Sequence, residues 1–149
     1  MGSEVQEDMI ARMRLLRESL DANAATNGRV HARSVMVAQE YAQADAVKGI
    51  WALISLGEGD YVRAADLICT EGAHRINLVG TCKVAEKAEP VDVETMELTM
   101  IAEAKAWLRS LVTEGWGIRV VRIVHSGQMA APWGRIVFNL EAAAPFRRY

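Results

Sequence analysis

The clearest pattern in the chain is a stripe of apolar residues at helical spacing near its beginning. The stripe consists of Val5, Met9, Met13, Leu16 and Leu20. Their separations of three or four residues place them on one side of an α-helix, which has about 3.6 residues per turn. Ser3 and Gln6 form a capping-box pattern before the stripe, and Asn27-Gly28 after it favours a left-handed stop. The pattern predicts an amphipathic helix over residues 4–25.

Four later segments have the patterns of β-strands. An apolar run over residues 49–56 and a β-branched run over residues 118–125 are both of strand length. Residues 75–84 and 133–143 alternate apolar with polar positions, so each would turn one face toward a core. These segments predict four strands, two before and two after a second helix.

The second helix is predicted to start near Asp92, as its N-cap, and to end around Gly115. Pro90 and Asp92 supply a helix start, and Gly115-Trp116-Gly117 ends the pattern. Its apolar stripe consists of Met100, Ile101, Ala104, Trp107, Leu108 and Leu111. Two segments are less definite. Residues 29–40 indicate a short strand followed by a loop or a turn of helix, and residues 61–74 form a connector of mixed propensity.

The order of these elements is helix, weak strand, strand, strand, helix, strand, strand. Consecutive strands pair most simply in an antiparallel or mixed sheet, and amphipathic helices then cover one face of it. We therefore expect an α+β fold with a sheet of four to five strands and two amphipathic helices packed on one face. The length of 149 residues and the hydrophobic content of 51% suit one domain over residues 1–149 with a sizeable core.

Charge and cysteine content argue against several classes of function. The net charge of -2 gives no basic excess of the kind that nucleic-acid-binding domains show. No apolar run approaches the roughly 18 residues of a membrane span, and the opening MGSEVQEDMI has no apolar core of a signal peptide. Cys69 and Cys82 lack a CxxC motif or a histidine at ligand spacing, so we expect two half-buried thiols in a reducing compartment.

Residues that would support catalysis occur only as isolated candidates. Cys69 and His125 would need to meet as a nucleophile and base, and nothing in their spacing brings them together. The stretch His125-Ser126-Gly127-Gln128 is explained more simply as a tight turn. The acidic residues at the start of the second helix are Asp92, Glu94 and Glu97. We interpret them as a solvated first turn, because helix positions two apart point in different directions. The sequence therefore predicts no catalytic site, no metal and no cofactor.

Arginines and a tryptophan on or near the predicted strands are the better candidates for a functional surface. Arginine and tryptophan are enriched at protein interfaces, where arginine also forms ion pairs. The candidate interface residues are Arg33, Arg63, Arg75, Arg119, Arg135 and Trp133. The alternative is that the arginines are ordinary surface charge.

Six stretches combine these helix and strand patterns in a definite order. They are VQEDMIARMRLLRESL, GIWALISLGEG, HRINLVGTCKVA, VETMELTMIAEAKAWLRSL, IRVVRIVHSGQ and PWGRIVFNLE. Together they extend over most of residues 5–142. In this order they resemble the tail terminator (tail completion) proteins of long-tailed bacteriophages, of the phage lambda type.

The resemblance implies a mechanical role without catalysis. Such proteins close into a hexameric ring that caps the tail tube, stops its polymerisation and then joins the tail to the head connector. The implied partners are further copies of the chain, the tail tube protein and the head–tail connector or stopper protein. DNA would only pass through the lumen, and no membrane is implied. The implied location is the head-proximal end of the virion tail, with assembly in the host cytoplasm.

Three other interpretations stay open from the sequence. The protein would be another phage neck component, such as a head–tail stopper or adaptor, or a small dimeric α+β enzyme or ligand-binding protein, or a generic interaction module. An enzyme would bring several polar residues together at one site, whereas this sequence offers isolated ones. A ring-forming protein would be recognised by its native mass.

Overall fold

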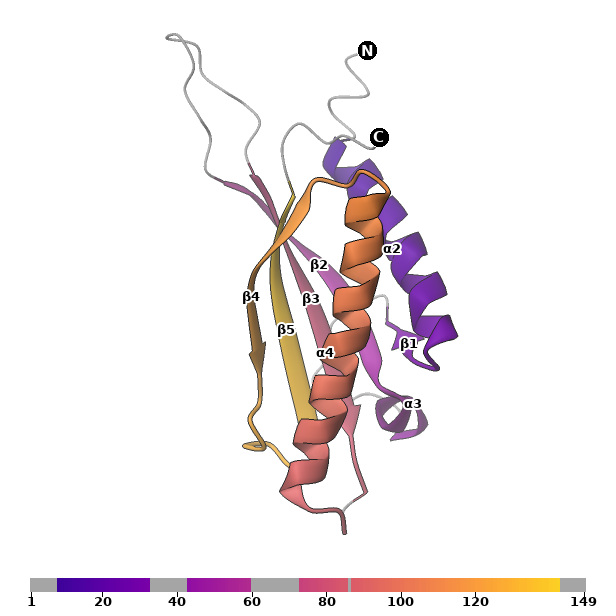
Figure 1. The fold of residues 1–149 in the computed structure, drawn as a ribbon, viewed down its shortest axis with the longest axis vertical. Helices are drawn as coiled ribbons and strands as arrows, with labels where there is room; N and C mark the ends of the chain where they lie inside the picture. Colours follow the sequence, from indigo (N-terminus) through magenta and orange to yellow (C-terminus); the bar gives the residue numbers. More distant parts are fainter. Residues whose placement is uncertain (1–7, 33–42, 60–72, 86, 143–149) are drawn as a thin grey trace, which may run out of the picture.

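The computed structural model describes residues 8–32, 43–59, 73–85 and 87–142 (Figure 1). Within these ranges the chain forms three helices and five strands. In chain order they are α2 (Asp8–Thr26), β1 (Val30–His31), α3 (Gln43–Lys48), β2 (Ile50–Gly59), β3 (Ala73–Lys83), α4 (Pro90–Thr113), β4 (Ile118–His125) and β5 (Trp133–Ala142). The α+β fold predicted from the sequence is confirmed.

The strands form one open, mixed sheet in the order β1-β2-β3-β5-β4. β1 runs parallel to β2, and the other neighbouring strands are antiparallel. In the middle of the sheet, Leu78 of β3 lies opposite Leu53 on one side and Phe138 on the other. The last strand in the sequence therefore lies inside the sheet, and β4 forms one of its edges.

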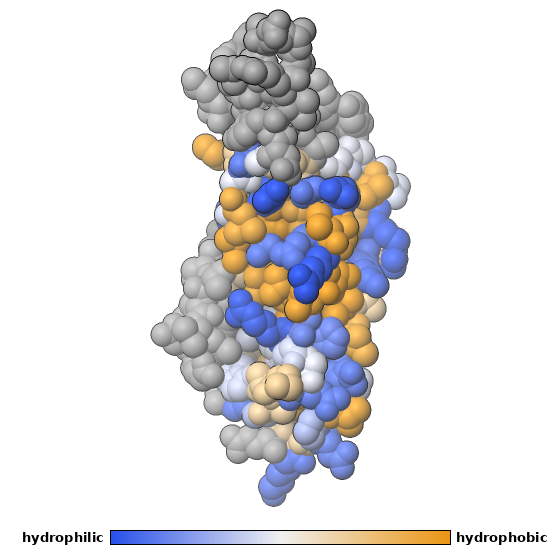
Figure 2. Space-filling model, turned by 90° about the vertical axis from the view of Figure 1, so that its left-hand side faces the viewer, coloured by the Kyte–Doolittle hydropathy of each residue, from blue (hydrophilic) through white to orange (hydrophobic). Residues whose placement is uncertain are grey.

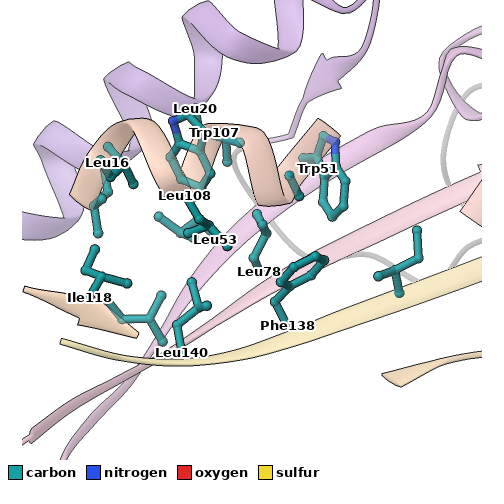
Figure 3. Packing of buried hydrophobic residues seen from close by; sticks show 14 of the residues in the cluster. Leu16, Leu20, Trp51, Leu53, Leu78, Trp107, Leu108, Ile118, Phe138 and Leu140 are labelled. Atoms are coloured by element: carbon teal, nitrogen blue, oxygen red, sulfur yellow. The ribbon is translucent and has the colours of Figure 1, made fainter. Parts of the chain in front are cut away.

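The two long helices, α2 and α4, lie side by side against one face of the sheet, as Figure 1 shows. Side chains from both helices and from the strands meet between the layers (Figure 3). The labelled members of this core are Leu16, Leu20, Trp51, Leu53, Leu78, Trp107, Leu108, Ile118, Phe138 and Leu140. The rings of Trp51 and Phe138 meet edge to face at 6.2 Å between centroids. Gly80 makes room for this packing, because a Cβ there would lie 2.7 Å from the Trp51 ring.

The predicted helix over residues 4–25 is confirmed where the structure describes it. Met13 and Leu16 of its apolar stripe are buried, and Gly28 just beyond it takes a left-handed φ of 72°. The capping-box pattern of Ser3 and Gln6 lies outside the described residues. The C-terminal end of α2 is linked to α4 by Arg29, which donates two hydrogen bonds of 2.8 and 2.9 Å to the carboxylate of Glu103.

The second helix begins slightly earlier than a cap at Asp92 would place it. Its first residue is Pro90, and the Glu89 N–H donates to Asp92 Oδ2 at 2.9 Å. Asp92 therefore lies in the first turn of the helix, and its carboxylate accepts a hydrogen bond from the N-cap residue, Glu89. Proline suits this place because it has no N–H to leave unsatisfied.

The indefinite segment 29–40 contributes only the two-residue strand β1, which pairs with Ile50 and Trp51 of β2. A parallel pair needs a crossover connection, and the described part of that connection is the short helix α3, which packs against β3. This third helix adds to the two that the sequence predicts. None of the described helices is long and apolar enough to cross a membrane.

Candidate assembly surface

The strand β4 forms an open edge of the sheet. Among the described residues it pairs with β5 alone, so the N–H and C=O groups along its other side have no strand beside them. Such an edge is a ready template for another chain. The sequence predicts this strand with the observed bounds, Ile118–His125, but it does not reveal the position of the strand at an edge.

The side chains of β4 are unusually apolar for an exposed edge. Val120, Val121 and Val124 are 40%, 52% and 40% exposed. A break in the register between Val120 and Arg122 marks a bulge at Val121, the most exposed of the three. The bulge and the exposed Arg119 and Arg122 are devices that limit uncontrolled pairing at an edge, but the three partly exposed valines still give this strand an apolar surface that suits contact with another chain.

The neighbouring flank of α4 extends this apolar surface. Val91, Leu98 and Val112 are each about half exposed and are separated by seven or fourteen residues, which places them on one side of the helix. Figure 2, which faces the β4 side of the molecule, shows hydrophobic side chains gathered there between hydrophilic ones.

A groove of about 440 Å³ separates this flank of α4 from β4. Its lining residues are Lys105, Leu108, Arg109, Val112, Thr113, Ile118 and Val120. We call it the α4–β4 groove. A helix and an edge strand with a groove between them are the elements that capture extended peptides in several binding domains.

Four of the six predicted interface residues lie on one face of the sheet. Arg75, Arg119, Arg135 and Trp133 alternate with the core positions of their strands and so point away from α2 and α4. We call this the outer face. The other two predicted residues, Arg33 and Arg63, lie outside the described residues.

The carboxylate of Glu141 lies between two of these arginines, Arg119 and Arg75, and interacts with both. Arg119 donates to Glu141 Oε2 through Nη2 at 2.6 Å and Nε at 3.1 Å, and Arg75 Nε lies 4.0 Å from Glu141 Oε1. Arg135 and Trp133 stand further along β5, where the Trp133 ring is 5.4 Å from the ammonium group of Lys83. The predicted residues therefore share a face but form two separate groups on it.

Arg122, which the predicted set leaves out, also belongs to the outer face. It is exposed on β4 and lies opposite Asn139 of β5. On the described strands β3, β5 and β4, the outer face combines four arginines and Lys83 with one carboxylate, that of Glu141. The sequence signal for Arg122 was present, because it lies in the same β-branched strand as Arg119. The outer face and its β4 edge are thus basic in a chain that is slightly acidic overall.

At the β1 edge of the sheet, opposite β4, the surface is a larger groove with charges of both signs. A groove of about 790 Å³ runs between α2 and the β1–β2 edge, with Met9, Ile10 and Met13 on its apolar side. Its lining includes charges of both signs, for example Glu18 and Arg14. The two ends of the sheet are therefore unlike each other in shape and charge.

Beside β4, a buried carboxylate fixes the turn to β5. Glu97 of α4 has no exposed surface. It accepts hydrogen bonds from the Arg135 N–H at 2.8 Å, from the Ser126 N–H at 3.2 Å and from Ser126 Oγ at 2.5 Å, and His125 Nδ1 lies 3.1 Å from its other oxygen. The end of the edge strand is thus clamped to the helix.

This burial corrects the interpretation of Asp92, Glu94 and Glu97 as one solvated group. Glu97 follows Val93 by four residues and precedes Met100 by three, so it falls on the buried stripe of the helix. Spacing relative to the apolar residues, rather than to the other acids, was the signal that locates it.

The same contacts give the His125-Ser126-Gly127-Gln128 stretch a structural role. Its turn is confirmed, with left-handed φ values of 62° and 74° at Gly127 and Gln128. Ser126 Oγ donates to Glu97, so its hydroxyl is not held by His125 for activation. Cys69, the other member of the nucleophile and base pair for which the spacing gives no support, lies outside the described residues.

Cys82 is more deeply placed than the half-buried thiol that we expect from the sequence. It has no exposed surface, and a Cβ on Gly134 would approach its Sγ to 2.6 Å. Burial, with a further contribution from the charge of Glu97, raises the pKa of the Cys82 thiol to about 11. The thiol is therefore protonated at neutral pH and is a poor nucleophile.

A serine and a histidine also meet at Ser55 and His74, with 2.7 Å between Oγ and Nε2. Arg12 Nη1 lies 2.8 Å from His74 Nδ1. Because arginine has donors only, Nδ1 must accept, and the proton of the neutral ring is then on Nε2, which donates to Ser55. His74 in this form cannot take a proton from Ser55, so the pair lacks the geometry of a nucleophile and its base.

The described residues contain no group of three or more histidine, cysteine or acidic side chains placed to hold a metal ion.

No protein-family model matches the chain, and no curated protein matches it. The surface features of the described residues are the β4 edge, the α4–β4 groove and the basic outer face. They suit association with another protein chain.

Proposed function

We propose that this protein is a structural subunit that assembles into a closed ring, and that the ring is the tail terminator of a phage-like particle. The observation that carries the proposal is the open β4 edge, on which Val120, Val121 and Val124 are 40–52% exposed and which has the apolar flank of α4 next to it. An open edge strand with exposed apolar side chains is a template on which another chain can pair.

The unlike ends of the sheet favour a head-to-tail contact. Contacts between different surfaces of identical subunits generate rings when the rotation closes. Pairing of two β4 edges about a two-fold axis is disfavoured, because it brings Arg119 and Arg122 of one strand close to those of the other. The β4 edge is thus suited to a different surface of the next copy.

In this role the subunit would work mechanically. The ring would cap the tail tube, stop its polymerisation and present a surface to the head–tail connector, with DNA passing through the lumen. Six copies, the virion location and these partners come from the resemblance of the sequence to tail terminators. Another neck component would use the same open edge, and its ring would differ in where it is found on the particle.

The proposal is tested by replacing Val121, the most exposed valine of β4, with glutamate. We expect Val121→Glu to remain a folded monomer, whereas Val121→Ile keeps an apolar β-branched side chain and assembles as the wild type does. Native mass measurements with and without tube protein give the oligomeric state, and circular dichroism confirms folding. A wild-type chain that stays monomeric in both conditions would refute the ring.

A further inference from the structure

We infer that the α4–β4 groove binds an extended segment of a partner protein that alternates apolar and acidic side chains, added to β4 as a further strand of the sheet. The inference rests on the proposed assembly role, since it names the chemistry that the open edge accepts. It adds that the recognised element is a single extended segment and that its charge is negative.

The groove has an apolar floor. Leu108 and Ile118 are 6% and 8% exposed, and Val112 and Val120 rise beside them at 56% and 40%. A strand placed next to β4 would lie about 4.8 Å from it and would turn every second side chain toward this floor. Those side chains would be apolar, since burial against valine, leucine and isoleucine favours them.

The charges around the groove are basic. Lys105 and Arg109, one turn apart on α4, are the only ionisable residues among those described in its lining. The alternate side chains of an added strand would point to the outer face, where Arg122 stands exposed on β4. The carboxylates of such a segment point to the outer face and meet Arg122 there, and Lys105 and Arg109 beside the groove add to the positive potential around the segment, whereas a basic segment meets repulsion.

Backbone pairing supplies the remaining contacts. Strand addition satisfies the N–H and C=O groups along the side of β4 that no described strand pairs with, and pockets beside the strand select the side chains. Glu97 holds the end of β4 in place through Ser126, so the template is fixed before a partner arrives. The phosphates of a nucleic acid would use the arginines but neither the apolar floor nor the edge amides, so the surface favours a protein segment.

The test uses three fluorescein-labelled probes: an eight-residue peptide of alternating valine and glutamate, its valine–lysine counterpart, and a single-stranded DNA oligonucleotide. Fluorescence anisotropy with the full-length chain measures binding. We expect the valine–glutamate peptide to bind at least about tenfold more tightly than either other probe. Hydrogen exchange of the β4 amides should slow when this peptide is present.

Two variants locate the binding. Val112→Glu places a carboxylate in the groove and should weaken binding of the valine–glutamate peptide by about tenfold or more. Val47→Glu is the matched control, because Val47 is 58% exposed on α3, outside the groove lining; this variant should bind as the wild type does.

Absence of peptide binding, equal binding of the valine–lysine peptide, tighter binding of the oligonucleotide, or an unchanged affinity in Val112→Glu would each overturn the inference. None of these results depends on ring formation, which native mass measures separately. A ring without peptide selectivity would leave the proposed function standing and remove the inference. A monomer that binds the peptide selectively would do the reverse.

Discussion

Glu97 offers the sharpest test of how the structure holds its edge strand. Replacing the fully buried Glu97 with alanine leaves the N–H groups of Ser126 and Arg135 and the Ser126 hydroxyl, which are partly buried, without their acceptor. Each buried polar group that loses its partner costs about 1–3 kcal/mol. Because the three share one acceptor and relax together, we expect Glu97→Ala to lower the free energy of unfolding by about 3–5 kcal/mol.

Glutamine at the same position separates hydrogen bonding from charge. The three donors from Ser126 and Arg135 all meet Glu97 Oε2, so the side-chain carbonyl oxygen of a glutamine placed there keeps them. The amide NH₂ of that glutamine then faces His125, whose neutral ring accepts at Nδ1 in one tautomer. We expect Glu97→Gln to cost about 1–2 kcal/mol, because charge-assisted hydrogen bonds become neutral ones.

Urea unfolding followed by tryptophan fluorescence and far-ultraviolet circular dichroism measures both variants. Small domains are stable by about 5–15 kcal/mol, so the alanine variant should show a greatly lowered midpoint or be partly unfolded without urea. A loss below about 1 kcal/mol in Glu97→Ala would refute the clamp. Equal losses in both variants would show that the negative charge, rather than the hydrogen bonds, fixes the turn.

Three further predictions concern packing, titration and the outer face. Gly80→Ala should destabilise the fold by about 1–3 kcal/mol in urea unfolding, because the added Cβ would lie 2.7 Å from Trp51. The Cys82 pKa is raised from 9.0 to about 11 in the folded protein; the unfolded chain therefore loses this proton first, and stability should fall as pH rises from about 9 to about 11. The pH dependence of unfolding in a Cys82→Ala variant should lack this component, and an identical slope in both proteins would contradict it. A double-mutant cycle on Arg119 and Glu141 should give a coupling of at most about 1 kcal/mol, because Arg119 is largely exposed; a much larger value would show that the pair is not a surface contact.

Periodicity predicts most of the secondary structure because burial imposes it directly on the sequence. The stripes of α2 and α4 and the alternation in β3 and β5 each record one face turned to a common core. The parallel strand β1 escapes firm prediction, because two residues are too few to show a period. The position of β5 between β3 and β4 is equally hidden, since pairing partners are set by packing across the whole sheet and not by neighbours in sequence.

The candidate surface could be predicted in part. Arg75, Arg119 and Arg135 fall on one face because side chains alternate along strands, and that regularity is visible in the sequence. The exposure of Val121 is not visible, because a β-branched run has the same appearance in a central strand as in an edge strand. The burial of Glu97 is visible in its spacing relative to Val93 and Met100, but the donors that satisfy its carboxylate are distant in sequence and only the fold brings them to it.

The central claim is that the β4 edge assembles this chain into a closed ring. Native mass spectrometry of the full-length protein with tail tube protein, alongside Val121→Glu and Val121→Ile, tests it most directly. We predict one closed oligomer of fixed size, expected from the resemblance to be a hexamer, for the wild type and Val121→Ile, and a folded monomer for Val121→Glu. A wild-type monomer at every concentration, or the same oligomer in Val121→Glu, would contradict the account.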